Sequence, residues 1–77
     1  MALSRSQAFG LALREVRTER GLSQEDAALA CNIDRAYFGQ LERALKSPTL
    51  NTIWRIADSF ELRASDLLLR AEKLLDL

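Results

Sequence analysis

The sequence contains no histidine and only one cysteine, Cys31. A disulfide framework needs paired cysteines and a zinc site needs several cysteine or histidine ligands, so neither is expected. The lack of histidine also rules out histidine-based acid–base catalysis. We therefore expect no metal and no cofactor, and we interpret Cys31 as a small core residue in a reducing, intracellular location.

The chain also lacks any long apolar run. Apolar residues make up 48% of its 77 residues and charged residues 29%, which is an ordinary globular composition. No stretch is long enough to cross a bilayer, and none resembles a signal peptide. A chain of this size has a marginal core, so we expect a single domain over residues 1–77 that gains stability by packing against a second copy.

An excess of positive charge is missing as well. The net charge is zero, which argues against nucleic-acid binding, because proteins that bind nucleic acids usually carry surplus Lys and Arg. The charge is unevenly distributed, however. Residues 1–57 hold eight basic and six acidic side chains, whereas residues 58–77 hold three basic and five acidic ones. The compensating negative charge thus lies mainly in the C-terminal part.

Hydrophobic periodicity predicts five helices and no strand. They are expected at residues 4 to about 20, 24–30, 35 to about 43, 50–60, and from about Ser65 onward. Gly21 follows the first helix, where a left-handed residue ends a helix cheaply. Ser23, Asp34 and Thr49 are suitable N-caps for the next three, and Asp26 takes the place of the usual Glu in a capping box.

The central stretch Gln24–Arg43 is predicted to be two short helices joined by a sharp turn. Such a pair needs a small residue at the crossing, here Ala28, and a residue that tolerates positive φ, here Asn32. Apolar residues flank the turn: Ala27, Cys31, Ile33, Phe38 and Leu41. On spacing alone, a DNA-reading helix-turn-helix and an ordinary hairpin in a small bundle are equally good interpretations.

The run LSQEDAALACNIDRAYFGQLER, followed by SPTLNTIWRIADSFEL, resembles the Cro and phage-repressor (XRE) family of DNA-binding domains. The resemblance covers nearly all of residues 9–68, although Asn32 and Glu61 stand where the family usually has Gly. It implies an all-α, five-helix, lambda-repressor-like domain. The combination of DRAY and LER in so short a chain also resembles the controller proteins of restriction-modification systems.

The resemblance implies that the third helix enters the major groove with its first turn leading. Arg35, Ala36 and Gln40 would then read bases, since they suit guanine, a thymine methyl and adenine respectively. The alternative is that Arg35 and Gln40 are solvated helix positions. The expected phosphate ligands are Gln24, Tyr37, Arg43 and Lys46. For Tyr37, simple packing of an amphipathic ring on the surface explains the residue nearly as well.

Two residues of the third helix look unfavourable there. Gly39 weakens a helix by about 1 kcal/mol relative to Ala, so we expect it to allow a close approach to DNA. Glu42 would repel phosphate, and the resemblance implies that it instead forms a partly buried structural ion pair with Arg17 of the first helix.

Residues 64–77 are predicted to form a C-terminal dimerisation helix. We expect Leu67 and Leu68 to close the core, with Trp54 and Phe60 also buried. The remaining leucines would form an interface: Leu69, Leu74, Leu75 and Leu77. The alternative is a helix end that frays. A two-fold dimer would place its reading helices about 34 Å apart, on a nearly palindromic operator.

Together these inferences predict a sequence-specific transcriptional regulator in a bacterial or phage cytoplasm, associated with the nucleoid. The expected partners are double-stranded DNA, a second copy and, through exposed acids such as Glu25, RNA polymerase. The alternatives are a restriction-modification controller protein and an antitoxin-like protein-binding module. An enzyme is not expected, because the adjacent acids Glu25 and Asp26 diverge on a helix.

Overall fold

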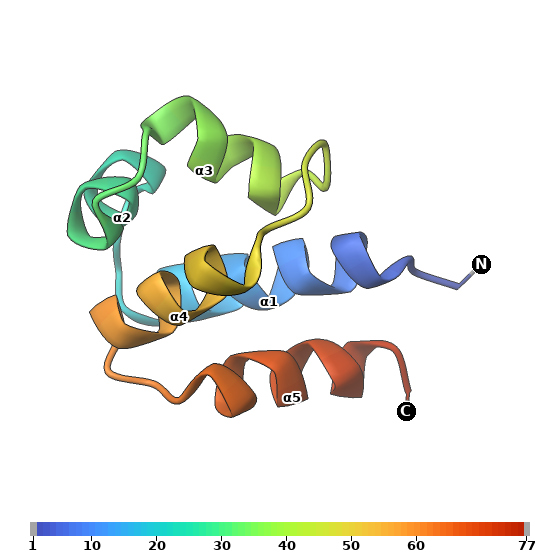
Figure 1. Cartoon of the computed structure of the whole chain (residues 1–77). Coiled ribbons are helices and arrows are strands. Elements are labelled where there is room, and N and C mark those ends of the chain that lie inside the picture. Colours follow the sequence, from blue (N-terminus) through green and yellow to red (C-terminus); the bar gives the residue numbers. More distant parts are fainter. Residues whose placement is uncertain (1, 77) are drawn as a thin grey trace.

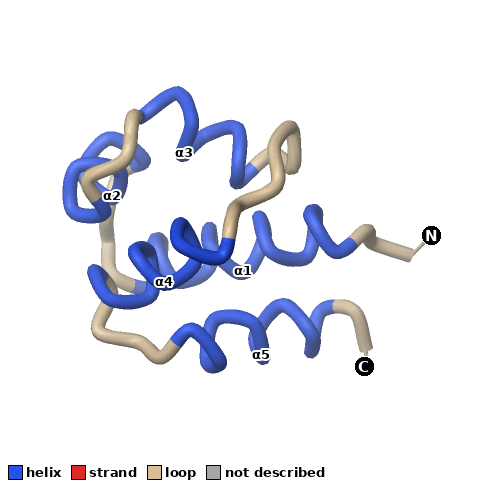
Figure 2. The backbone as a smooth tube through the Cα atoms, viewed as in Figure 1, coloured by secondary structure: helices blue, strands red, loops and turns tan. Residues whose placement is uncertain are grey.

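The computed structural model describes residues 2–76. Within that range it contains helices joined by loops and turns, and no strand (Figures 1 and 2). The helices are α1 (Arg5–Glu19), α2 (Gln24–Cys31), α3 (Arg35–Glu42), α4 (Leu50–Ser59) and α5 (Ala64–Leu74). All five predicted helices are confirmed. Their other ends lie within one residue of the predicted ones, but the helix predicted over residues 64–77 ends at Leu74. Leu75 is its C-cap, and Asp76, with φ 61°, has a left-handed backbone that cannot continue the helix.

The predicted N-caps are present. Ser23, Asp34 and Thr49 each accept a hydrogen bond from the backbone N–H three residues further on, at 3.0, 3.3 and 3.1 Å. Each cap satisfies one of the free N–H groups at the start of its helix. Only half of the predicted capping box is formed, since Asp26 makes no return bond to the Ser23 N–H in the described chain.

Three non-glycine residues between helices have a left-handed backbone. Asn32 has φ 55° and ψ 46°, as predicted, and Glu61 has φ 57° at the other position where the family usually has Gly. Ala44, with φ 60°, was not predicted. A left-handed conformation costs a residue with a Cβ roughly 1–2 kcal/mol, so tertiary packing must hold these turns. Gly21, with φ 68°, takes the same conformation without that cost.

α1 is the central element. α5 runs antiparallel beside it, and α3 packs against it from another side (Figure 1). α2 contacts both α3 and α4, so the helix pair α2–α3 is attached to the rest of the domain on two sides. The largest fully buried side chains are Phe38, Leu13, Leu41, Ile56, Leu67, Val16 and Cys31.

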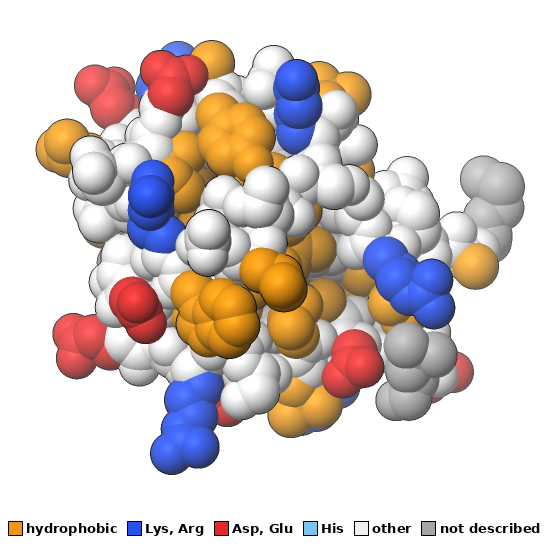
Figure 3. All heavy atoms as spheres, viewed as in Figure 1, with side chains coloured by type: hydrophobic (Ala, Val, Ile, Leu, Met, Phe, Trp, Pro, Cys, Tyr) orange, Lys and Arg blue, Asp and Glu red, His pale blue; other side chains and the backbone are white. Residues whose placement is uncertain are grey.

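Two residues predicted to be core are exposed. Trp54 is 53% exposed and Leu68 is 40% exposed, so both predictions were wrong. On α4 the buried positions are Ile56 and Ala57, followed by Phe60 at the C-cap, and on α5 Leu67 and Ala71 fill the space against the core. Trp54 and Leu68 instead line a shallow groove between α4 and α5. Hydrophobic side chains gather over these two helices in Figure 3.

No helix within residues 2–76 is long and apolar enough to cross a membrane. The same residues contain no group of three or more His, Cys, Asp or Glu side chains positioned to hold a metal ion.

Candidate nucleic-acid interface

The α2–α3 pair is built around small and apolar residues. Ala27, Ala28 and Cys31 of α2 are buried, as are Phe38 and Leu41 of α3, and Ile33 packs against this core while half-buried. The set predicted to hold the two helices together is therefore confirmed. The Cys31 thiol lies 2.9 Å from the Ser59 hydroxyl, and burial raises the pKa of the thiol above its usual range. Cys31 is thus a protonated core residue that tethers α2 to α4.

One side of α3 faces solvent. Arg35 and Ala36 are exposed and Gln40 is half-exposed, whereas Phe38 and Leu41 are fully buried. This is the division of faces that we predicted for a reading helix whose first turn leads. Tyr37 is half-buried and packs against the core, which agrees with the packing interpretation of its ring.

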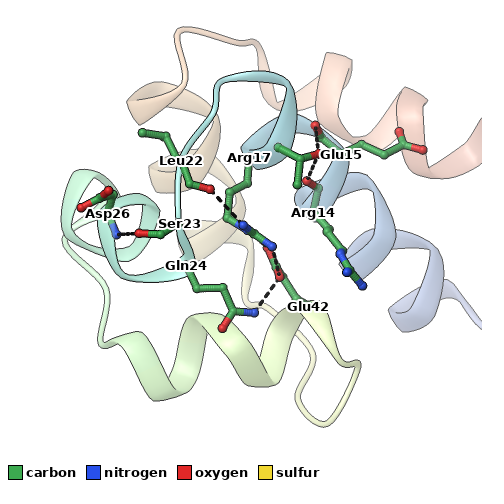
Figure 4. Close-up of polar contacts among 9 residues, drawn as sticks. Arg14, Glu15, Arg17, Leu22, Ser23, Gln24, Asp26 and Glu42 are labelled. Atoms are coloured by element: carbon green, nitrogen blue, oxygen red, sulfur yellow. Dashed lines mark hydrogen bonds and ion pairs between the residues drawn. The ribbon is translucent and has the colours of Figure 1, made fainter.

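The predicted ion pair between α1 and α3 is present (Figure 4). Arg17 Nε donates to Glu42 Oε2 at 2.6 Å, and its Nη2 donates to Oε1 at 3.2 Å. Arg17 Nη1 also donates to the Leu22 carbonyl at 2.9 Å. The Glu42 side chain is only 3% exposed. The carboxylate is therefore neutralised inside the domain and is not presented to DNA.

Glu42 also binds Gln24, which sequence analysis did not foresee. Gln24 Nε2 donates to Glu42 Oε1 at 2.8 Å, so the first residue of α2 is connected through α3 to α1 (Figure 4). The three side chains Arg17, Glu42 and Gln24 form one network, which we call the anchor network. It fixes the ends of α2 and α3 relative to α1.

A second contact fixes the C-terminal end of α3. A Cβ at Gly10 of α1 would lie 2.5 Å from the Glu42 carbonyl oxygen and 2.6 Å from that of Leu41. Only glycine allows the two backbones to approach so closely, because those distances are far below van der Waals contact. Sequence analysis missed Gly10. A glycine in mid-helix was the available signal, but its contact is with a segment about thirty residues away.

Gly39 has a different environment from the one expected. It is buried, and a Cβ there would lie 3.2 Å from Arg43 Nη1 and 3.5 Å from Gln24 Oε1. The missing side chain leaves room for Gln24 and Arg43, whereas we had expected it to leave room for DNA.

Three exposed cations lie on α3 and the loop after it, and half of the acids in residues 1–57 are paired with arginines elsewhere. Three cations of α3 and the loop after it, Arg35, Arg43 and Lys46, are exposed, and none forms an ion pair within residues 2–76. Three of the six acids in residues 1–57 are occupied elsewhere: Glu42 is in the anchor network, and Glu15 and Glu19 pair with Arg70 at 3.5 and 2.6 Å. Arg70 lowers the pKa of Glu19 by donating a hydrogen bond to it.

The leucines predicted to form an interface do not share one face of α5. Leu69 lies beside Arg70 and Lys73, Leu74 lies beside Leu11 and Arg14 of α1, and Leu75 packs against the core near Phe9. Leu69 is 49% exposed and Leu74 is 36% exposed. Leu77, the fourth, lies outside the described residues.

Comparison with known proteins places this geometry in context. A family model described as Helix-turn-helix matches residues 13–67. The HTH-type transcriptional regulator DdrOP3 of Deinococcus deserti is 41% identical over 56 residues, which make up 73% of this chain and 43% of that protein. The chain thus spans less than half the length of this relative.

Two solved structures match over nearly their whole length. The restriction-modification controller protein C.AhdI from Aeromonas hydrophila is 37% identical with a TM-score of 0.78, covering 80% of this chain and 94% of that one. The controller protein C.Esp1396I, a tetramer in complex with its natural 35 base-pair operator, is 23% identical with a TM-score of 0.87, covering 97% and 99%. At that identity the second structure shows the fold alone.

Proposed function

The chain belongs to the helix-turn-helix family, and we propose that it is a transcriptional regulator that binds double-stranded operator DNA in a sequence-specific manner. The observation that carries the proposal is the geometry of α3. Its first turn presents Arg35 and Ala36 to solvent, while the anchor network and the Gly10 contact hold its other end against α1. A rigidly held helix with exposed side chains at its N-terminal turn is suited to the major groove.

Within this proposal Arg35, Ala36 and Gln40 read bases, and Gln24, Tyr37, Arg43 and Lys46 hold phosphates. The unpaired cations of α3 and its following loop support this assignment. The site has no catalytic group in our proposal, and we place its action on nucleoid DNA in the cytoplasm.

Arg35→Ala is expected to reduce sequence preference without abolishing DNA binding. A bidentate arginine–guanine contact discriminates against a wrong base by about 1–3 kcal/mol, and the phosphate contacts are unaffected by its loss. The measurement is a gel shift with the duplex upstream of the chain's own operon and with a scrambled duplex. Lys46→Ala serves as the control, because it should weaken both complexes equally. Unchanged preference in Arg35→Ala would remove this residue from the base-reading set.

We further propose that two copies associate through the groove between α4 and α5. Its apolar lining includes Trp54, Leu62 and Leu68, and its polar lining includes Asp58 and Arg63. In a two-fold interface each copy presents the same surface, so the acid of one copy can face the arginine of the other. Leu68 also borders the groove beside Phe9 and Leu75, which extends the apolar surface along α5.

Leu68→Glu is expected to produce a monomer at micromolar concentration, because it places a carboxylate at the centre of the proposed interface. Leu69→Glu is the matched control, since its side chain points away from the α4–α5 groove. Analytical ultracentrifugation distinguishes the two. A wild-type protein that is monomeric at this concentration would refute the dimer, and dissociation by Leu69→Glu alone would assign the interface to the leucines predicted from sequence.

The similarity to C.AhdI favours a restriction-modification controller protein as the more specific function. Two observations would support a controller protein: an operator upstream of the chain's own gene, and a restriction gene next to that gene. Contact with RNA polymerase would use the exposed Glu25 on α2. An antitoxin-like protein-binding module is the alternative, and the similarity to a controller protein at 37% identity favours the DNA-binding function over it.

A further inference from the structure

Arg43 lies over Gly39. Side chains on a helix point back toward its N-terminus, so Arg43 covers the turn that contains the residue four positions earlier. That residue is Gly39, and its missing Cβ would be 3.2 Å from Nη1 and 3.8 Å from Cζ of Arg43. The planar guanidinium of Arg43 therefore lies close to the backbone of α3, in space that the side chain of any larger residue at position 39 would fill.

Gln24 reaches the same place from α2. Its amide nitrogen must face Glu42, because a carboxylate only accepts hydrogen bonds, and the 2.8 Å bond between them agrees. The amide oxygen is then directed to the other side, 3.5 Å from the position of a Gly39 Cβ. An oxygen acceptor and a guanidinium thus converge above Gly39, and Glu42 determines which end of the amide faces the guanidinium.

We propose that Gly39 is a positioning residue that seats the Arg43 guanidinium beside the Gln24 amide oxygen, so that the guanidinium presents its N–H groups as a preformed cradle for one DNA phosphate in each protomer. The inference depends on the proposed DNA-binding function and assigns Gly39 a specific role within it. Arg43 is exposed and has no ion-pair partner in the described chain, so its guanidinium N–H groups are free for a phosphate. The first N–H groups of α2, beside Gln24, add donors of the same kind.

The proposal separates stability from binding. Alanine is a better helix former than glycine, and the group that its methyl would meet is the flexible end of Arg43. Gly39→Ala should therefore fold at least as stably as the wild type. It should nevertheless displace the guanidinium from the cradle. The two effects have opposite signs, which a purely structural role of Gly39 would not produce.

The test is a double-mutant cycle of Gly39→Ala and Arg43→Ala, measured by fluorescence anisotropy on the upstream operator duplex and on a scrambled duplex. Each single variant is expected to weaken binding of a dimer to both duplexes by about a hundredfold, the loss of one charge-assisted hydrogen bond in each of the two protomers. Each should also reduce the slope of log affinity against log salt by about 2 for a dimer. In the Arg43→Ala background, Gly39→Ala should have no further effect, and the melting temperature of Gly39→Ala should not fall.

Three results would overturn the proposal. If Gly39→Ala still weakens binding in the Arg43→Ala background, the glycine acts by direct approach to DNA. If Gly39→Ala leaves affinity unchanged, Arg43 does not need the space. If it lowers the melting temperature, the glycine is needed for folding. Failure of the proposed function would give a different result. A wild-type protein that binds the operator and the scrambled duplex equally well would refute sequence-specific regulation. The double-mutant cycle measured on the scrambled duplex would still test the phosphate cradle.

Discussion

Glu42→Gln is expected to lower the free energy of unfolding by about 3–5 kcal/mol, because removing one partner of a buried ion pair leaves the other charge uncompensated. Here the remaining charge is Arg17, whose side chain is 13% exposed. A domain of this length has a total stability of about 4–12 kcal/mol, so the variant should lose a large fraction of it. Urea unfolding monitored by circular dichroism measures the loss.

Glu19→Gln is the matched control. Glu19 also pairs with an arginine, at the same 2.6 Å distance, but its side chain is 54% exposed. Water and salt screen such a pair, so this variant should unfold at nearly the wild-type urea concentration. If the two variants unfold together, Glu42 behaves as a solvated carboxylate and the anchor network does not stabilise the fold.

The anchor network matters beyond stability because it determines where α3 points. The Arg17–Glu42 pair and the close contact at Gly10 both hold the C-terminal end of α3, so the side chains of its N-terminal turn remain available to contact DNA. Any base contact by Arg35 requires that turn to be held in a fixed orientation. We therefore expect that partial loss of the pair would reduce operator affinity even in protein that remains folded.

Sequence reasoning succeeded where the determinants are local. A cap such as Ser23 or Asp34 acts on an N–H group three residues away, and Asn32 needs only its own backbone conformation. The helix boundaries and the sharp turn could therefore be predicted closely. The Arg17–Glu42 contact is not local, and it was accessible only through the family resemblance.

Sequence reasoning failed where a helix carries more apolar positions than the core covers. Trp54 and Ile56 are both apolar positions on α4, and periodicity alone could not show that Ile56 would be buried and Trp54 exposed. Leu67 and Leu68 on α5 were both predicted to close the core, and only Leu67 does. Gly10 and Gly39 were recognisable as unfavourable helix residues, but what fills the space at each became visible only in the structure.

The affinity for operator DNA is expected to fall by about two decades between about 50 and 200 mM salt, because Arg43 and Lys46 of two protomers would neutralise about four phosphates and release that many counterions. The other proposed phosphate ligands, Gln24 and Tyr37, are uncharged and would not add to this salt dependence. Fluorescence anisotropy with a labelled operator at several salt concentrations measures the slope. Lys46→Ala should make the slope shallower, whereas Arg35→Gln should change preference more than slope, since a base contact neutralises no phosphate. A flat response would show that the unpaired cations of α3 and its loop do not face the DNA backbone.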